Sequence, residues 1–169
     1  MTPEEAKRLL QAHSGRDADT DPAKWESGFV YTHRSAPDDN HEATFLEIME
    51  CIRVLAPEIA ASPTVDRELM AALWGLIYLP RVWAFNPRQL EGRERGGHPC
   101  QSGDQLSRLA DQLDRIAEAV DYALNGVPES VGDAMVEYGE PLPNYAAIVQ
   151  RHAEPGAAVD RGRKAGPGH

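Results

Sequence analysis

The sequence predicts an all-α fold, an irregular helical bundle of about four main helices with short C-terminal helices and a flexible tail. Three observations favour this class. Apolar residues recur at helical spacing, residues that begin and end helices flank those stretches, and no stretch alternates apolar and polar residues as a half-buried strand does. We expect a single helical domain over 1–152, whose last short helices span 129–138 and 144–152. Residues 153–169 offer few apolar side chains to offset the entropy of ordering, and are predicted to be a disordered tail.

Residues 102–126 carry the most complete helix signal in the chain. Ser102 and Gln105 are spaced for a capping box at the start of the helix. Gly126 and Pro128 mark its end, because glycine adopts the left-handed conformation and proline cannot continue a helix. Aliphatic residues recur every three or four positions on one face, namely Leu106, Leu109, Leu113, Ile116, Val120 and Leu124. The pattern predicts a long amphipathic helix that forms one wall of the core.

The N-terminal region is predicted to contain a short helix followed by a long loop. Thr2 and Glu5 are spaced for another capping box, which predicts a helix that ends near His13. Residues 14–39 contain several glycines, prolines and aspartates, so we expect a long, partly ordered loop there. Within this loop only 29–31 resembles a brief extended segment.

A second long helix is predicted over 38–56, ended or kinked by Pro57. Its apolar face is expected to point inward and comprises Phe45, Ile48, Met49, Ile52 and Leu55. On the same helix Glu47 and Glu50 share roughly one face, which suits either an acid and base pair or solubilising charge. We expect solubilising charge.

A third long helix is predicted from Ser62 or Thr64 to Leu79. Pro80 interrupts the pattern, and the apolar surface is expected to continue beyond it in a kinked or separate turn. After its polar start the segment is apolar on every side, which is typical of a helix at the centre of a domain. The aromatic residues in and after this segment are expected in the core rather than around a ligand pocket, namely Trp74, Tyr78, Trp83 and Phe85.

Charge and composition narrow the classes of function. The net charge of -10 argues against wrapping nucleic acid, which requires a basic stripe, and favours a protein partner with a basic surface. Two cysteines are too few for a disulfide framework, and no apolar run approaches the ~20 residues that cross a bilayer. We therefore expect a soluble, cytoplasmic protein that does not associate with membranes.

The acidic segment between residues 16 and 42 is the expected partner-binding region, and its candidate residues are Asp17, Asp19, Asp21, Asp38 and Asp39. The alternate aspartates at its start match the first ligand positions of an EF-hand. However, Pro22 stands where that loop requires glycine, and Gly28 stands where it requires glutamate. An acidic loop is therefore favoured over a calcium site.

The Arg- and Gly-rich loop 88–103 is the expected location of an anion site. Guanidinium groups, glycines and the free N–H groups of the following helix suit a phosphate or a carboxylate. The candidate ligands are Arg88, Arg93, Arg95, His98 and Ser102. No Walker or dinucleotide-binding motif accompanies them, so a plain surface loop is favoured.

A metal site is the weakest of the candidate sites. His98 and Cys100 are suitable zinc ligands, but the remaining ligands would have to come from distant segments. The candidates for those positions are Cys51, His41 and His33. We expect Cys51 to be a small buried apolar group and the histidines to lie on the surface, with no metal and no cofactor.

Two classes of function follow from these patterns. The first, which we favour, is a non-enzymatic acidic helical protein that binds a protein partner, such as an inhibitor, an immunity protein or a small assembly subunit. The alternative is a small ligand-binding or enzymatic helical domain with an anion or metal site in the loop 88–103. No catalytic residue is assigned, since the sequence contains neither a nucleophile elbow nor a His-Glu-x-x-His motif.

Overall fold

Every regular element in the described part of the chain is a helix, and the predicted all-α class is confirmed. The structure, a computed structural model, describes residues 1–16, 26–35, 41–85 and 103–136. Its α-helices are α1 (Pro3–Ser14), α3 (Phe29–Ser35), α4 (His41–Ala61), α5 (Arg67–Phe85), α7 (Gly103–Leu124) and α8 (Val131–Val136). A 3₁₀ turn, η1 (Pro128–Ser130), precedes α8.

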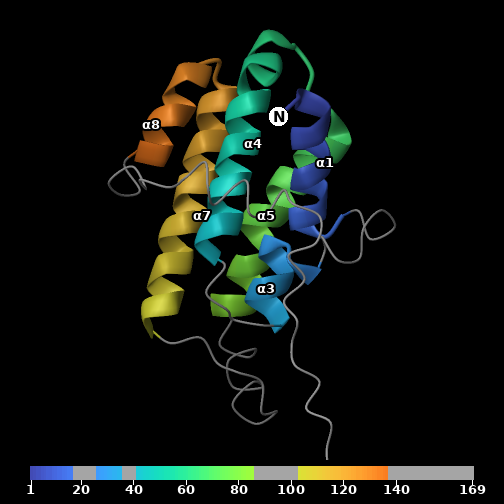
Figure 1. Ribbon diagram of the computed structural model, residues 1–169. Helices are drawn as coiled ribbons and strands as arrows, with labels where there is room; N and C mark the ends of the chain where they lie inside the picture. The colour runs from blue at the N-terminus through green and yellow to red at the C-terminus, as the bar shows by residue number, and fades with distance from the viewer. Residues whose placement is uncertain (17–25, 36–40, 86–102, 137–169) are drawn as a thin grey trace, which may run out of the picture.

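The four long helices form a bundle in which each packs against two of the others (Figure 1). α4 packs against α1 and α7, and α5 packs against the same two helices, so α4 and α5 lie at opposite corners. α1 and α5 run in one direction, whereas α4 and α7 run in the other. The short α3 lies at one end of the bundle, and α8 lies beside α7 at the other end.

Aliphatic side chains from all four long helices fill the space between them. The largest fully buried ones are Leu10, Ile48, Met49, Ile52, Leu73, Leu76, Leu109, Leu113 and Ile116. Each such side chain contributes roughly 1.5–3 kcal/mol when it leaves water, so their burial is the main favourable term that holds the helices together. The predicted inward face of α4 is confirmed, as is the apolar face of α7, except for its first and last members, Leu106 and Leu124.

Two helix ends have the predicted chemistry. At the start of α1 the Thr2 N–H donates to Glu5 Oε2 at 2.8 Å, and the Glu5 N–H donates to Thr2 Oγ1 at 3.2 Å. This is the predicted capping box. At the end of α7 Gly126 has φ +77°, and the Val127 N–H donates to the Tyr122 carbonyl at 3.0 Å. The left-handed glycine therefore closes this helix as predicted.

The predicted loop over 14–39 is wrong in part, because Phe29–Ser35 is the helix α3 and not an extended segment. Phe29, Val30 and His33 are buried, and their spacing places them on one side of a helix. α3 packs against α1, α4 and α5. Since a helix this short is marginal by itself, these tertiary contacts determine its conformation.

α4 continues through Pro57 to Ala61, so of the two predicted effects of this proline the end of the helix is wrong, whereas a kink stays a prediction. Proline removes the N–H that would bond the carbonyl of Arg53 one turn earlier. Beyond the proline Ile59 is buried, and its packing holds the last turn of α4 in the helix.

α5 begins after Asp66, and the predicted start at Ser62 or Thr64 is wrong. The Oδ1 atom of Asp66 accepts two backbone N–H groups of the first turn, at 2.7 and 3.1 Å, as an N-cap aspartate does. Its Oδ2 atom accepts a hydrogen bond from Lys7 Nζ at 2.6 Å. This bond lowers the pKa of Asp66 and raises the pKa of Lys7. The capping residue therefore also links α5 to α1.

A separate turn after Pro80 is also wrong, since α5 runs through this residue to Phe85, whereas a kink there stays a prediction. The expectation that this helix is buried on every side is wrong as well. The side chains of Trp74, Tyr78 and Phe85 are 57%, 47% and 40% exposed, whereas Trp83 is partly buried against the core. Because α5 occupies a corner of the bundle, it packs against α1, α3 and α7 and turns one face outward.

The C-terminal prediction is tested only as far as residue 136. The predicted helix over 129–138 is present as η1 followed by α8. Val131 and Ala134 are buried, and α8 packs against α4 and α7. The predicted helix over 144–152 and the tail over 153–169 lie outside the described residues.

Candidate functional site

The metal-site candidates His33, His41 and Cys51 lie in the described part of the chain, whereas the other site residues predicted from the sequence lie outside it. They are the anion-site candidates Arg88, Arg93, Arg95, His98 and Ser102, the partner-binding candidates Asp17, Asp19, Asp21, Asp38 and Asp39, and Cys100. Within the described part, the structure brings together buried polar residues for which the sequence predicts surface positions. It also exposes aromatic residues for which the sequence predicts core positions.

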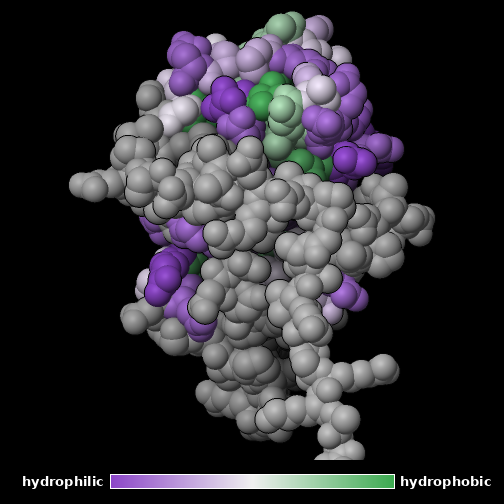
Figure 2. Space-filling model, viewed as in Figure 1, coloured by the Kyte–Doolittle hydropathy of each residue, from purple (hydrophilic) through white to green (hydrophobic). Residues whose placement is uncertain are grey.

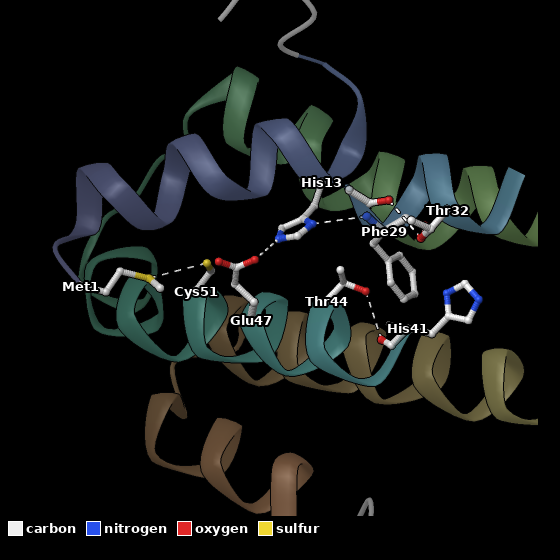
Figure 3. Close-up of polar contacts among 9 residues, drawn as sticks. Met1, His13, Phe29, Thr32, His41, Thr44, Glu47 and Cys51 are labelled. Carbon is white, nitrogen blue, oxygen red and sulfur yellow. Dashed lines mark hydrogen bonds and ion pairs between the residues drawn. The ribbon is translucent and has the colours of Figure 1, made fainter. Parts of the chain in front are cut away.

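A buried polar cluster joins α1, α3 and α4 (Figure 3). His13 of α1 and Glu47 of α4 are both buried, and the Nε2 atom of His13 lies 2.8 Å from the Oε2 atom of Glu47. On the other side of the ring, the N–H of Phe29 at the start of α3 donates to Nδ1 of His13 at 3.3 Å. One imidazole therefore connects three helices. The expectation that Glu47 is solubilising surface charge is wrong.

These contacts fix the position of the proton on the His13 ring. Because Nδ1 accepts the Phe29 N–H, the proton of the neutral ring is on Nε2, which donates to the Glu47 carboxylate. Carboxylates orient imidazoles in the same way in catalytic triads and behind metal-bound histidines. In both of those settings the second ring nitrogen faces a substrate or a metal, whereas here it bonds to the backbone. The geometry therefore suits the positioning of helices.

A second buried histidine, His33, lies on α3 beside this cluster. Its ring stacks on that of His41 of α4, with centroids 4.0 Å apart and planes 11° apart, and it meets the Phe29 ring edge-on at 4.5 Å. Burial, and to a smaller extent His41, lower the pKa of His33 from 6.5 to about 2. The ring is therefore neutral at physiological pH, and the expectation that His33 lies on the surface is wrong.

Cys51 is a buried apolar group, as predicted, and its Sγ atom lies 3.6 Å from the Sδ atom of Met1 (Figure 3). Among the described residues, no three histidine, cysteine, aspartate or glutamate side chains are grouped so that they could hold a metal ion. A surface depression of about 280 Å³ lies where α4 ends and α5 begins, lined by Leu55, Ile59, Leu69 and neighbouring residues. None of the cluster residues lines this depression.

The sequence contains a signal for the polar cluster that periodicity alone did not reveal. His13 follows Ala6 and Leu10 on the buried face of α1. Glu47 directly precedes Ile48 in the most apolar part of α4. A polar residue on the apolar face of a helix needs a buried partner, since an unpaired polar group is costly there. Pairing His13 with Glu47 still required the tertiary structure, because 34 positions separate them.

The outer faces of α5 and α7 carry the most distinctive surface of the described helices. Trp74, Tyr78 and Phe85 form what we call the α5 aromatic face, in which the Trp74 and Tyr78 rings stack with centroids 5.7 Å apart. The acidic residues that recur along the outside of α7, which we call the α7 acidic stripe, are Asp111, Asp114, Glu118 and Asp121. The Arg81 guanidinium of α5 donates to the Asp114 carboxylate at 2.5 Å. This ion pair joins the two helices at the border of the two surfaces.

The surface of the upper end of the molecule in Figure 2 is mainly hydrophilic and carries only a small hydrophobic patch. None of the helices in the described ranges is long and apolar enough to cross a membrane. Comparison of the chain with protein-family models, with curated proteins and with solved structures finds no match. The functional proposal therefore rests on the surfaces and charges of this chain.

Proposed function

We propose that this protein is a non-enzymatic acidic helical protein that binds a protein partner through a basic surface of that partner. An inhibitor, an immunity protein and a small assembly subunit all belong to this class. The observation that carries the proposal is the α7 acidic stripe. Its members recur at spacings of three and four, so they follow one line along the outside of the helix.

The charge of the chain is concentrated in this region. Residues 103–136 contain seven aspartates and glutamates and two arginines, a net charge of -5 out of -10 for the whole chain. Like charges three and four positions apart on a helix repel each other, by roughly 0.2–0.5 kcal/mol per pair. Repulsion between neighbouring carboxylates of the stripe therefore offsets part of the stabilisation of α7, and cationic side chains of a basic partner would relieve this repulsion.

Some members of the stripe already have local partners. Arg115 donates to Glu118 at 3.1 Å, and Asn125 donates to Asp121 at 2.8 Å. Such exposed pairs contribute little and exchange readily with other partners, because water and salt screen them. They are consistent with a surface that accepts lysine and arginine side chains from another protein.

The test is affinity capture of proteins from the native cell extract, with the wild type and two charge-reversed variants compared as bait. The first carries Asp111→Lys and Asp121→Lys in the stripe. The second, its matched control, carries Glu26→Lys and Glu58→Lys, which change the net charge equally at exposed positions outside α7. We expect the wild type and the control to retain a basic protein that elutes with salt, and the stripe variant to lose it.

The captured protein is then purified and its binding measured by calorimetry at two salt concentrations. Weaker binding at high salt and a loss of at least about tenfold in the stripe variant are expected for several exposed charge contacts. Equal binding by the stripe variant and the control would refute a role for the stripe. Capture of no basic protein under low-salt conditions would refute the proposed function.

A further inference from the structure

The α5 aromatic face has the features of an anchor in a protein interface. Its side chains lie at positions i, i+4 and i+11 of one helix and are between 40% and 57% exposed. Isolated exposed apolar residues are ordinary, but a tryptophan, a tyrosine and a phenylalanine on one helix face are a concentration of the residue types enriched at interfaces. Tryptophan and tyrosine are also frequent among the residues that dominate binding energy.

Within this face the Trp74 and Tyr78 rings are stacked on each other, and both side chains are about half exposed. The Trp74 and Tyr78 planes are 12° apart with centroids separated by 5.7 Å, so the two rings lie nearly parallel. The face of an aromatic ring carries partial negative charge and attracts cations. Arginine suits such a surface better than lysine, because the planar guanidinium stacks on a ring and is less strongly hydrated than an ammonium group.

The carboxylates of the α7 acidic stripe favour a cationic occupant. Arg67 and Arg81 lie on the same face of α5 as the pair, and the charge of Arg81 is balanced by Asp114 of α7. Asp111 and Asp121 lie one turn before and two turns after Asp114 on the stripe, and both are exposed. A second copy of the chain would bring another net charge of -10 against this surface, which disfavours self-association.

We propose that the Trp74–Tyr78 pair is the docking site for arginine side chains of the basic partner, with the α7 acidic stripe receiving neighbouring cationic residues. This inference rests on the proposed function and specifies the residue type that the surface selects. The aromatic pair provides the preference for arginine over lysine. The stripe provides the salt-sensitive attraction, which does not distinguish the two cations.

The test uses two synthetic peptides of equal length, oligo-arginine and oligo-lysine, with the full-length protein. We expect the wild type to bind oligo-arginine about twofold to fivefold more tightly than oligo-lysine, the range that stacking on exposed aromatic rings supports. Trp74→Leu keeps an apolar side chain but removes the larger of the two rings, so it should lower the affinity for oligo-arginine more than the affinity for oligo-lysine and thereby reduce the preference. The matched control is Leu124→Ala, which shortens an exposed apolar residue of α7 and should leave the preference intact.

The outcomes separate this inference from the proposed function. If both peptides bind with equal affinity, or if Trp74→Leu retains the full preference for arginine, the docking site is refuted while an acidic binding surface stands. If neither peptide binds even at low salt, the proposed function fails too. Sedimentation of the wild type and Trp74→Leu tests the other occupant, since a dimer that dissociates on substitution would assign this face to a second copy of the chain. Circular dichroism checks that each variant is folded.

Discussion

His13 connects three helices through two hydrogen bonds. Loss of its partner Glu47 should lower the free energy of unfolding. In Glu47→Ala the buried Nε2–H of His13 loses its acceptor. A buried donor without an acceptor costs about 1–3 kcal/mol, so we expect the free energy of unfolding to fall by that amount. Urea denaturation followed by circular dichroism measures the change.

Two variants serve as controls for this experiment. Glu47→Gln keeps an oxygen acceptor for the His13 N–H and should retain more stability than Glu47→Ala. Glu50→Ala removes a carboxylate of the same helix that pairs with exposed Arg53, and should change the stability by no more than about 1 kcal/mol. Equal losses in Glu47→Ala and Glu50→Ala would show that the contact between His13 and Glu47 does not support the fold.

His33 should make the protein less stable in mild acid. In the unfolded chain its pKa is near the ordinary value of 6.5, whereas in the folded protein burial lowers this pKa to about 2. Between these values the unfolded state binds more protons, so stability is complete above pH 6.5 and is lost as the pH falls. The loss from this one group approaches ~1.4 kcal/mol per pH unit, or about 2 kcal/mol from about pH 7 to about pH 5.

The variant His33→Phe tests this prediction, because phenylalanine keeps an aromatic ring beside Phe29 and His41 but has no proton to gain. Urea denaturation near neutral pH and in mild acid should show a smaller acid loss for the variant than for the wild type. An identical loss in both proteins would assign the acid sensitivity to other groups.

At the scale of helices, the sequence predicted two helix ends that depend on local chemistry, although not the N-cap of α5 at Asp66. The capping box of α1 and the glycine end of α7 involve residues close together in the chain, and both were predictable. The continuation of α4 and α5 through their prolines was not predictable, because the effect of a proline depends on its surroundings in the folded protein. Pro57 is exposed and Pro80 is buried, and α4 and α5 continue through both.

The helix α3 and the polar cluster were not predicted from the sequence for the same reason, which is that both depend on contacts between distant residues. The Phe29 N–H that begins α3 bonds to His13, 16 positions earlier, and the same ring bonds to Glu47, 34 positions later. No local pattern contains either contact. The exposure of the α5 aromatic face was not predicted because the local pattern was misleading. A helix that is apolar on every side suggests complete burial and does not reveal its place at a corner of the bundle.

Substitution of two glycines by alanine is expected to change the stability of the protein in opposite directions. A Cβ atom added at Gly126 or at Gly132 would meet no atom within 4 Å, so steric clashes do not distinguish the two positions. Gly126 has φ +77°, where an L-residue is strained, so Gly126→Ala should destabilise the protein by about 1–2 kcal/mol. Gly132 lies inside α8, so Gly132→Ala should stabilise it by about 0.5–1 kcal/mol.

Thermal unfolding of the two variants side by side measures this difference, and each serves as the control for the other. Equal effects would show that the left-handed conformation at Gly126 does not end α7. A loss of stability in Gly132→Ala would show that α8 does not persist as a helix at that position.

At the scale of the whole molecule, the charge that suits a basic partner opposes the fold. α7 buries its aliphatic face against α4 and α5 and carries its acidic stripe on the other side. The buried face provides most of the stabilisation of the bundle, whereas an exposed pair such as Arg81–Asp114 contributes about 1 kcal/mol at most. The proposed function therefore implies that stability and partner binding respond to salt in opposite directions, because screening relieves the repulsion within the stripe and also weakens its attraction for a cation.

This opposition gives a prediction for the free protein. Raising sodium chloride from about 0.02 M to about 0.5 M shortens the Debye length from roughly 20 Å to roughly 4 Å, so the repulsion along α7 should fade and the wild type should become more stable. The variant Asp111→Asn with Asp121→Asn lacks two of the four stripe charges and should gain less from salt. Urea is the suitable denaturant, because it is uncharged and leaves the ionic strength unchanged. The same salt increase should weaken binding of the wild type to oligo-lysine. An equal gain in stability for the wild type and the variant would show that the dominant repulsion lies outside the stripe.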